Sequence, residues 1–357
     1  MRVTNDPSPA DSSSPTRAPA RAAVIVPAYG VAHLVAEALA SLQRQTLTDW
    51  ECVVIDDGAP DDVAGAVAPF LPDPRIRFLA TPNRGVSAAR NLAIRETRAP
   101  LVALLDGDDL LRPDYLAAMT RALDADSQAR FASCNARIFG AVPKERLCFT
   151  QPQGNGDGHG SLRDVLDRSY GVYIGATFRR ADFDAIGGFD ESMAHAEDFD
   201  FWVRLMLLGG HVQYVDRVLC DYRVRSTSAS AQTLKMISGN LRVYEKAREA
   251  LPADAPEIAL IDSLIAEQEA GIEFEQAMDA VIARSSRKRV LQLRRAHALV
   301  GHNAASPLWR AAFALWRLMP PLAPPMLRWR RALHSRGREG SSLRALGNAL
   351  GAGRKVA

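Results

Sequence analysis

The first 105 residues alternate between continuous apolar runs and segments in which apolar residues recur at helical spacing. The apolar runs, which have the length of buried strands, lie at 22–27, 50–55, 75–80 and 100–105. Helices are predicted between them, at 31–42, 60–70 and 86–97. Strands that are apolar throughout and alternate with helices are typical of a mostly parallel sheet covered on both faces. The pattern therefore predicts an α/β fold with an open, Rossmann-type mixed sheet.

Beyond residue 125 the pattern is less regular. We expect strands at 129–140, 145–149, 171–178, 211–216 and 218–224, a glycine-rich loop at 151–160 and a helix at 197–208. From about residue 231 the spacing is helical only. The start of the chain is rich in Pro, Ser and Ala, which predicts a flexible tail. Three parts follow: a tail over 1–20, an α/β domain over 21–230 and a helical extension over 231–357.

The formal net charge of +3 conceals an uneven distribution. Residues 284–357 hold 16 Lys and Arg against a single acid, Glu339, whereas residues 1–283 hold 28 basic and 40 acidic residues. An acidic body and a basic extension are expected to face different partners. Four widely spaced cysteines without a C-x-x-C pair are expected to be reduced thiols of a cytosolic protein.

Carboxylates gather directly after two of the predicted strands. Asp56 and Asp57 follow the second apolar run, and Asp106, Asp108 and Asp109 follow the fourth. Capping of the next helix remains an alternative for Asp56, but one helix start does not need three acids. Neighbouring carboxylates repel one another unless a cation lies among them. At the carboxyl ends of parallel strands, such a cluster predicts a divalent cation that brings a diphosphate with it.

Two further segments carry polar chemistry. The stretch N-R-G-V-S-A-A-R-N at 83–91 sets Arg84 and Arg90 among small residues, which suits either phosphate binding or a solvated helix surface. The stretch at 187–205 supplies five acids, which are Asp190, Glu191, Glu197, Asp198 and Asp200. A carboxylate at a helix start is ordinarily a cap, but one of these acids also suits a general base that accepts a proton from a substrate hydroxyl.

Two common nucleotide-binding motifs are missing from the sequence. No G-x-G-x-x-G follows the first predicted strand, and no G-x-x-x-x-G-K-[ST] occurs anywhere. The sequence therefore argues against a dinucleotide-dependent dehydrogenase and against a P-loop NTPase.

Five motifs occur in an order that resembles family 2 glycosyltransferases with the GT-A fold. They are V-I-V-P-A-Y, V-V-I-D-D-G, N-R-G-V-S-A-A-R-N, L-L-D-G-D-D-L-L and G-G-F-D-E…A-E-D-F-D-F-W-V-R-L. The resemblance covers about residues 22–225, and five ordered motifs are far more specific than any one of them. It implies an inverting transfer of a sugar from a nucleotide diphosphate sugar, with Mg²⁺ or Mn²⁺.

On the donor side, the resemblance assigns roles by motif position. Pro27 and Tyr29 resemble residues that flank the nucleotide. Asp57 resembles the acid that hydrogen-bonds the base, with Asp56 beside it. Arg90 resembles the basic residue near the nucleotide and the diphosphate.

The same resemblance implies the metal ligands and the catalytic base. Asp106 and Asp108 match a D-x-D motif that contacts ribose and metal, with Asp109 as an alternative metal ligand. Asp198 resembles the base that takes the proton of the acceptor hydroxyl, and Glu197 would support it.

The sequence departs from the family pattern at two points, which bear on metal binding and on the number of sugars added. Relatives often carry Tyr-Arg-x-His near the end of the catalytic domain, where this chain has Arg225 in place of the histidine. An arginine can contact a diphosphate but cannot bind a metal, so metal binding would rest on the aspartates alone. No Q-x-x-R-W follows the base region, and no apolar run reaches the length of a membrane span. Both absences favour addition of a single sugar over processive synthesis of a polysaccharide.

The leading interpretation is a glycosyltransferase that acts on a lipid-linked glycan in surface polysaccharide or cell-envelope synthesis. One alternative is a sugar nucleotidyltransferase, although the first strand is not followed by the glycine-rich basic loop it would need. A second is a degenerate sugar-nucleotide-binding protein without catalysis, against which the intact Asp106, Asp108 and Asp198 argue.

The basic extension predicts a peripheral membrane contact. In residues 308–316 one helical face gathers Leu308, Trp309, Ala312, Phe313 and Trp316. Together with the arginines of 284–357, this face suits an anionic membrane surface, which would place the enzyme in the cytoplasm against the inner face of the plasma membrane. The alternative is that the aromatic face packs on the catalytic domain. No nucleic acid is expected as a partner, since no nucleic-acid module is apparent.

Overall fold

A computed structural model describes residues 20–338, except 155, 173–174, 226–232 and 301–306. Ten strands form one sheet in the order β3-β2-β1-β4-β9-β6-β10-β5, with β7 paired to β6 and β8 to β10. The strands are β1 (Ala22–Ala28), β2 (Trp50–Asp57), β3 (Ile76–Thr81), β4 (Leu101–Leu104), β5 (Leu110–Leu111), β6 (Ala129–Gly140), β7 (Arg146–Leu147), β8 (His159–Gly160), β9 (Ala176–Arg179) and β10 (His211–Val224). The predicted tail falls almost entirely outside the described residues.

Most of the long strands run in one direction. Strands β1 to β4 are parallel, β9 is antiparallel to both β4 and β6, and β10 is parallel to β6. The carboxyl ends of β1, β2, β4, β6 and β10 therefore lie along the same edge of the sheet. The starts of β6 and β10 lie at the opposite edge. The predicted mixed sheet is confirmed.

Helices cover both faces of the sheet because successive strand residues point to opposite sides. Ala22, Val24 and Val26 pack with α1 (Ala32–Gln43), α2 (Val63–Val67) and α4 (Tyr115–Ala125). Ala23 and Ile25 pack on the other face, against side chains of α3 (Val86–Arg95), α5 (Leu162–Leu166), α6 (Arg180–Ile186), α7 (Glu197–Met206) and α8 (Thr233–Ala250). Each fully buried Val or Ile contributes about 1.5–3 kcal/mol to folding.

Two of the predicted strands in the second half are one strand. The predicted segments 211–216 and 218–224 are joined in β10, whose register against β6 shifts at three points. One shift leaves the exposed Asp216 and Arg217 out of the pairing with β6, which forms a β-bulge. This polar bulge is the reason that the sequence pattern predicted two strands. All four cysteines are free thiols, as expected.

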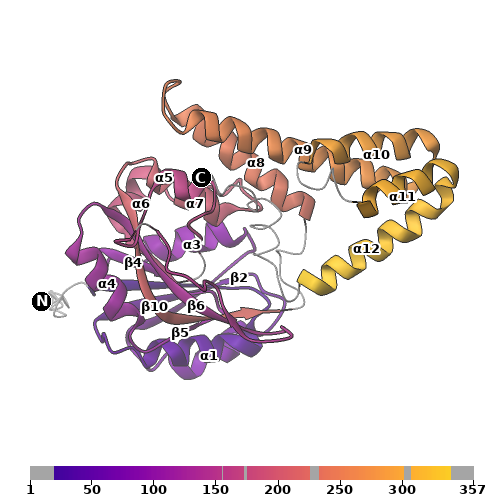
Figure 1. Ribbon diagram of the computed structural model, residues 1–357. Coiled ribbons are helices and arrows are strands. Elements are labelled where there is room, and N and C mark those ends of the chain that lie inside the picture. Colours follow the sequence, from indigo (N-terminus) through magenta and orange to yellow (C-terminus); the bar gives the residue numbers. More distant parts are fainter. Residues whose placement is uncertain (1–19, 155, 173–174, 226–232, 301–306, 339–357) are drawn as a thin grey trace, which may run out of the picture.

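The helices after the sheet belong to two packing groups. Helix α8 is part of the α/β body that the sheet and its covering helices form: Val243 and Tyr244 lie in its core, and the Lys246 ammonium contacts the buried Asp200 carboxylate of α7 and, at 2.9 Å, Asp190. The remaining helices are α9 (Ile258–Ala283), α10 (Arg287–Leu299), α11 (Pro307–Leu318) and α12 (Ala323–Arg338). The first turns of α9 pack on the body, where Ile261 is buried in the same core as Val243 and Tyr244. The rest of α9 and the other three helices form an arm that projects from the body (Figure 1).

The aromatic face of 308–316 is placed differently from both alternatives that the sequence suggested. Phe313 and Trp316 are buried and Trp309 is partly buried, in a core that the helices of the arm form among themselves. Of the predicted face, Leu308 is exposed. The aromatic side chains are therefore core of the arm and face neither a membrane nor the catalytic domain. Among the described residues, no helix combines the length and apolar character needed to cross a membrane.

Candidate active site

The turn after β4 brings its three aspartates to the carboxyl edge of the sheet. The Asp109 N–H donates to the Asp106 carbonyl over 3.0 Å, which closes the turn. Gly107 lies against the end of β1: a Cβ there would stand 2.9 Å from Val31 Cγ2 and 3.2 Å from the Pro27 carbonyl oxygen. Only glycine allows this approach, so the aspartate turn packs directly on the loop that follows β1.

Arginines lie among the three aspartates. The Asp106 carboxylate accepts a hydrogen bond from Arg90 Nη2 at 2.9 Å, and the Asp108 carboxylate pairs with Arg225 Nε at 2.6 Å. Asp109 accepts the backbone N–H of Arg223 at 2.7 Å. Asp109 is buried, and its Oδ2 has no hydrogen-bond partner within the described part of the chain. The side chains that pair with the carboxylates of the turn are therefore Arg90 of α3 and Arg225, which directly follows β10.

Burial and mutual repulsion raise the pKa values of two carboxylates in this cluster. Burial raises the pKa of Asp108, the Asp106 carboxylate adds to the rise, and Arg225 opposes it. Burial, with the negative charges of Asp108 and Asp106, raises the pKa of Asp109 well above its usual value. The nearby arginines oppose this rise without cancelling it.

Arg90 connects the aspartate turn to the acids of α7. Its Nη1 donates to Glu197 Oε1 at 3.2 Å while its Nη2 donates to Asp106. Its side chain is only 7 % exposed, and the guanidinium lies 5.4 Å from the centre of the Phe189 ring. Burial lowers the pKa of Arg90, but Asp106 and Glu197 together raise it above its usual value. The solvated-surface alternative for Arg90 is therefore wrong, and its predicted contact with a diphosphate stays a prediction.

The two acids at the start of α7 sit in different environments. Burial raises the pKa of Glu197, Asp198 raises it further, and Arg90 opposes the rise. Asp198 is exposed, and its Oδ1 accepts the N–H of Phe199 at 2.7 Å. The helix begins after Ala196, which is held at a left-handed φ of 59°. Such a conformation costs an alanine about 1–2 kcal/mol, which is typical of functional sites.

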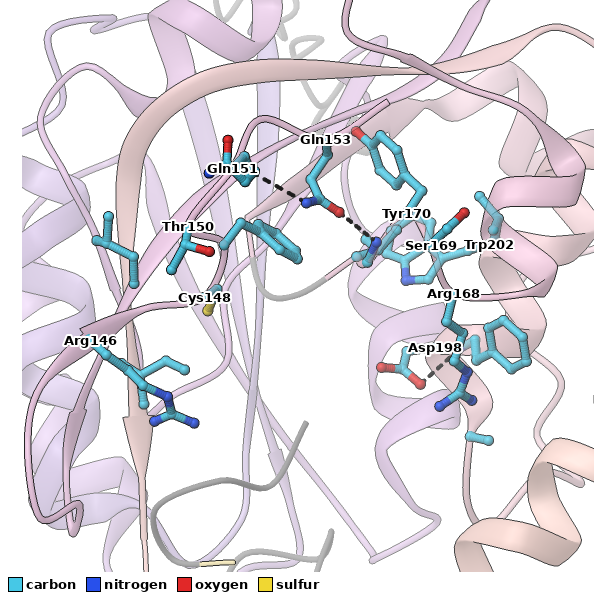
Figure 2. Close-up of a pocket in the computed structure, with 18 of the residues that line it drawn as sticks. Arg146, Cys148, Thr150, Gln151, Gln153, Arg168, Ser169, Tyr170, Asp198 and Trp202 are labelled. Carbon is cyan, nitrogen blue, oxygen red and sulfur yellow. Dashed lines mark hydrogen bonds between the residues drawn. The ribbon is translucent and has the colours of Figure 1, made fainter. Parts of the chain in front are cut away.

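Asp198 lines a cavity of about 620 Å³ that lies between the 146–153 segment and α7. Figure 2 shows Arg146, Thr150 and Gln151 on one side of this space and Arg168 with Asp198 on the other. The lining mixes polar side chains with buried aromatic rings, which are Phe199, Tyr170 and Trp202. Arg168, like Ala196, has a left-handed φ, and both residues line the cavity. Polar groups over an apolar floor suit a small polar ligand such as a sugar.

On the donor side, the predicted residues meet around the ends of β1 and β2. Both Asp57 oxygens accept backbone N–H groups, from Arg84 and Gly85, each at 2.8 Å. Asp57 therefore shapes the loop before α3. Asp56 is half-buried, and its Oδ1 accepts the Ala59 N–H at 2.8 Å within the turn after β2. The capping alternative for Asp56 is wrong, because the next helix, α2, is capped by Asp62.

The sequence did not reveal the structural roles of three residues around the site. The Asn91 side chain makes two hydrogen bonds to the Phe189 backbone, at 2.8 and 2.9 Å, and so fixes the turn before α7 to α3. Arg223 holds Asp109 through its backbone, and its Nε donates to the Asp108 carbonyl at 2.8 Å. Glu191 pairs with the exposed Arg84 at 2.8 Å. Asn91 and Glu191 belong to the N-R-G-V-S-A-A-R-N and G-G-F-D-E motifs, and Arg223 lies two residues before Arg225, but the contacts of all three are visible only in the fold.

Comparison with known proteins yields a sequence family. The family described as "Glycosyl transferase family 2" matches residues 23–181. The succinoglycan biosynthesis protein ExoU of Rhizobium meliloti (strain 1021) is 31% identical over 254 residues, which cover 66% of this chain and 70% of that protein. The chain spans a smaller share of other curated relatives, including two of which it covers only 26% and 23% of the length.

Solved structures share the fold. The S. aureus TarS structure of residues 1–349 in complex with UDP has a TM-score of 0.57 and 19% identity, and the match covers 87% of this chain and 91% of that one. The mannosyltransferase PcManGT from Pyrobaculum calidifontis, in complex with GDP-Man and Mn²⁺, has a TM-score of 0.56 and 21% identity over 90% and 87%. The mixed sheet with helices on both faces is thus the GT-A fold, and the chain belongs to glycosyl transferase family 2.

Proposed function

We propose that the protein transfers one sugar, with inversion, from a nucleoside diphosphate sugar to a hydroxyl of an acceptor glycan in polysaccharide biosynthesis. The observation that carries this proposal is the buried Arg90, which ties the Asp106 carboxylate to Glu197 beside Asp198. This contact places the aspartate turn, where we propose that a cation binds, next to Asp198, which lines the cavity. A donor diphosphate on one side and an acceptor hydroxyl on the other would meet between them.

The donor nucleotide would lie over the ends of β1 and β2. Tyr29 is 53% exposed and follows the partly buried Pro27, so its ring is available to a nucleobase. Asp56 lies beside Asp57, whose carboxylate already organises the loop before α3. We therefore assign base recognition to the Asp56–Asp57 pair, with Asp57 acting mainly through the loop. The UDP and GDP-Man complexes of the structural relatives support a nucleotide-sugar donor and leave its base open.

A divalent cation fits the aspartate turn. Asp106 and Asp108 offer hard carboxylate oxygens of the kind that Mg²⁺ and Mn²⁺ prefer. Burial, and then repulsion from Asp106, raise the pKa of Asp108. Asp109 is the weaker candidate, because one oxygen holds the Arg223 N–H and the residue is buried. When bound, the ion would neutralise charge on the departing diphosphate. Arg225 already reaches Asp108 and is placed to share that role.

Asp198 is the proposed general base. It lines the cavity, whereas Glu197 is held by Arg90, so Asp198 is the acid of the pair that can meet an acceptor hydroxyl. The base would take the hydroxyl proton while the oxygen attacks the anomeric carbon from the side opposite the diphosphate. A single displacement of this kind inverts the anomeric centre. Glu197 and Arg90 would keep the base region aligned with the donor.

We further propose that the arm contacts an anionic bilayer, where a lipid-linked acceptor would lie. Its exposed apolar side chains include Leu308, Leu315, Leu318, Met319, Met326 and Trp329. Arg310, Arg317 and Arg328 are exposed among them. This combination is typical of helices that lie in the membrane interface, and each basic residue near such a surface contributes about 1 kcal/mol. The lipid-facing residues differ from the aromatic face that the sequence suggested.

The function is tested by Asp198→Asn. The amide is nearly isosteric but cannot accept the hydroxyl proton, so transfer should fall by about 10²–10⁴-fold while donor affinity changes little. Transfer to an acceptor glycan and binding of the sugar nucleotide are measured separately. Asp254→Asn, an exposed acid before α9, is the matched control and should transfer normally. Near-normal transfer by Asp198→Asn would move the base to another acid.

The metal is tested by Asp108→Asn and by chelation. Loss of one of the two proposed ligands should reduce Mn²⁺-dependent release of nucleotide by about 100-fold or more, since the cation supplies several kcal/mol to the transition state. Excess EDTA should abolish release by the wild type. Asp216→Asn, on the exposed bulge of β10, is the control. Full turnover in EDTA would show that the aspartate turn works without a divalent ion.

The membrane contact is tested by co-sedimentation of the full chain with vesicles containing anionic lipid. The wild type should bind at low salt and dissociate as salt rises, because screening weakens the contribution of the arginines. The double variant Leu318→Glu/Trp329→Ser should bind at least about 10-fold less, since both side chains would leave the interface. Leu71→Ser, an exposed leucine of the α/β body, should bind like the wild type. A wild type that stays in the supernatant at low salt contradicts the proposal.

A further inference from the structure

Three side chains meet at the edge of the sheet opposite the proposed active site. Asp126 lies between α4 and β6, His211 begins β10 and His159 begins β8. The ligand-capable atoms of all three lie within 4.8 Å of one another. They come from segments up to 85 residues apart, and they meet because β6 and β10 start side by side while β8 pairs with β10.

The contacts in this cluster converge on one oxygen. His211 Nε2 lies 2.6 Å from Asp126 Oδ2, and His159 Nε2 lies 3.7 Å from the same oxygen. The two imidazole rings are stacked, with centroids 3.9 Å apart and planes inclined by 23°. Two imidazole nitrogens and one carboxylate oxygen that converge in this way form a group of three possible metal ligands.

Neighbouring groups orient the cluster in the way that metal ligands are oriented. His159 Nδ1 lies 3.3 Å from Asp157 Oδ2, and a hydrogen on Nδ1 leaves Nε2 unprotonated and directed at the cluster. The other oxygen of Asp126, Oδ1, accepts the Gln128 N–H at 2.9 Å, which turns Oδ2 toward the histidines. A carboxylate behind a ligating histidine is the usual support for a bound transition metal.

We propose that Asp126, His159 and His211 bind a zinc-class transition metal ion. Two imidazole nitrogens and one carboxylate oxygen suit Zn²⁺ or Co²⁺ and disfavour Mg²⁺, which prefers oxygen alone. In tetrahedral coordination, ligand atoms stand about 3.3 Å apart, so the three need only small adjustments. Their side chains are 21–32% exposed, which gives the ion access from solvent and leaves a fourth position for water.

The ion would fasten a wall of the acceptor cavity. Strand β8 lies between the cavity-lining segments that contain Gln153 and Tyr170, and the Gln153 side chain accepts the Gly171 N–H at 3.2 Å. Only two residue pairs join β8 to β10, so the strand has little hydrogen bonding of its own. A metal that joins His159 of β8 to His211 and Asp126 would hold this wall against the sheet. The role is structural and lies apart from the aspartate turn.

The experiment is a titration of the metal-free full-length protein with Co²⁺ and Zn²⁺. We expect one equivalent to bind at this site with the visible absorption of four-coordinate Co²⁺. His159→Gln and His211→Gln should each lose that absorption. Asp157→Asn should bind Zn²⁺ about 10–100-fold more weakly, because it removes only the support behind His159. Asp157 is largely exposed, so this variant is expected to fold normally.

Two controls separate this site from others. His33→Gln removes an exposed histidine of α1 and should keep the absorption. Asp108→Asn disables the aspartate turn and should also keep it, so failure of the proposed donor-metal site does not affect the result. Hydrogen exchange of the β8 amides should slow when Zn²⁺ is added to the wild type. A wild type without four-coordinate Co²⁺ absorption, or bands that survive in both histidine variants, would overturn the proposal.

Discussion

The buried guanidinium of Arg90 is the interaction on which the arrangement of the site depends. It has two carboxylate partners from distant parts of the chain, Asp106 after β4 and Glu197 at the start of α7. A buried cation needs such partners because water no longer solvates its charge. The cation in turn stabilises the two carboxylates that pair with it. Removing any one of the three would leave an uncompensated charge, so the donor edge and the base region are held as one unit.

The rest of the fold supplies the positions of these three groups. Parallel strands bring the aspartate turn to the same edge as the end of β10, whose Arg223 and Arg225 compensate Asp109 and Asp108. Asn91, one residue after Arg90, fixes the turn before α7 through the Phe189 backbone. Helix α8 then closes the far side of α7 through Lys246 and Asp200. In the proposed chemistry, the donor would lie over the strand ends and the acceptor would lie in the cavity beside Asp198.

The sequence predicted most of the sheet because its strands are buried on both faces and therefore read as unbroken apolar runs. It missed the continuity of β10, since a bulge at Asp216 and Arg217 looks like the end of a strand. It found the aromatic stripe of α11 but not its partner, because an amphipathic pattern is the same whether its apolar face meets lipid or another helix. The stripe packs against α9 and α10, which periodicity alone does not reveal.

The same limit applies to the site. Residue types and motif order predicted which acids would gather, including Asp106, Asp108 and Asp198. They did not show that arginines lie among the aspartates, nor that Arg90 pairs with Glu197 while Asp198 lines the cavity. Those facts depend on contacts between positions more than 100 residues apart. The Asp126–His159–His211 cluster was invisible for the same reason, since none of its members belongs to a motif.

The measurement that tests the central claim most directly is the transfer rate of Arg90→Lys. A lysine keeps the charge but has no planar fork, so it cannot hold Asp106 and Glu197 in their present geometry. We expect kcat to fall by about 100-fold with little change in donor affinity, since small misplacements of reacting groups cost this much. The exposed Arg84→Lys is the control and should be near wild type. A folded Arg90→Lys enzyme with wild-type kcat would contradict the account.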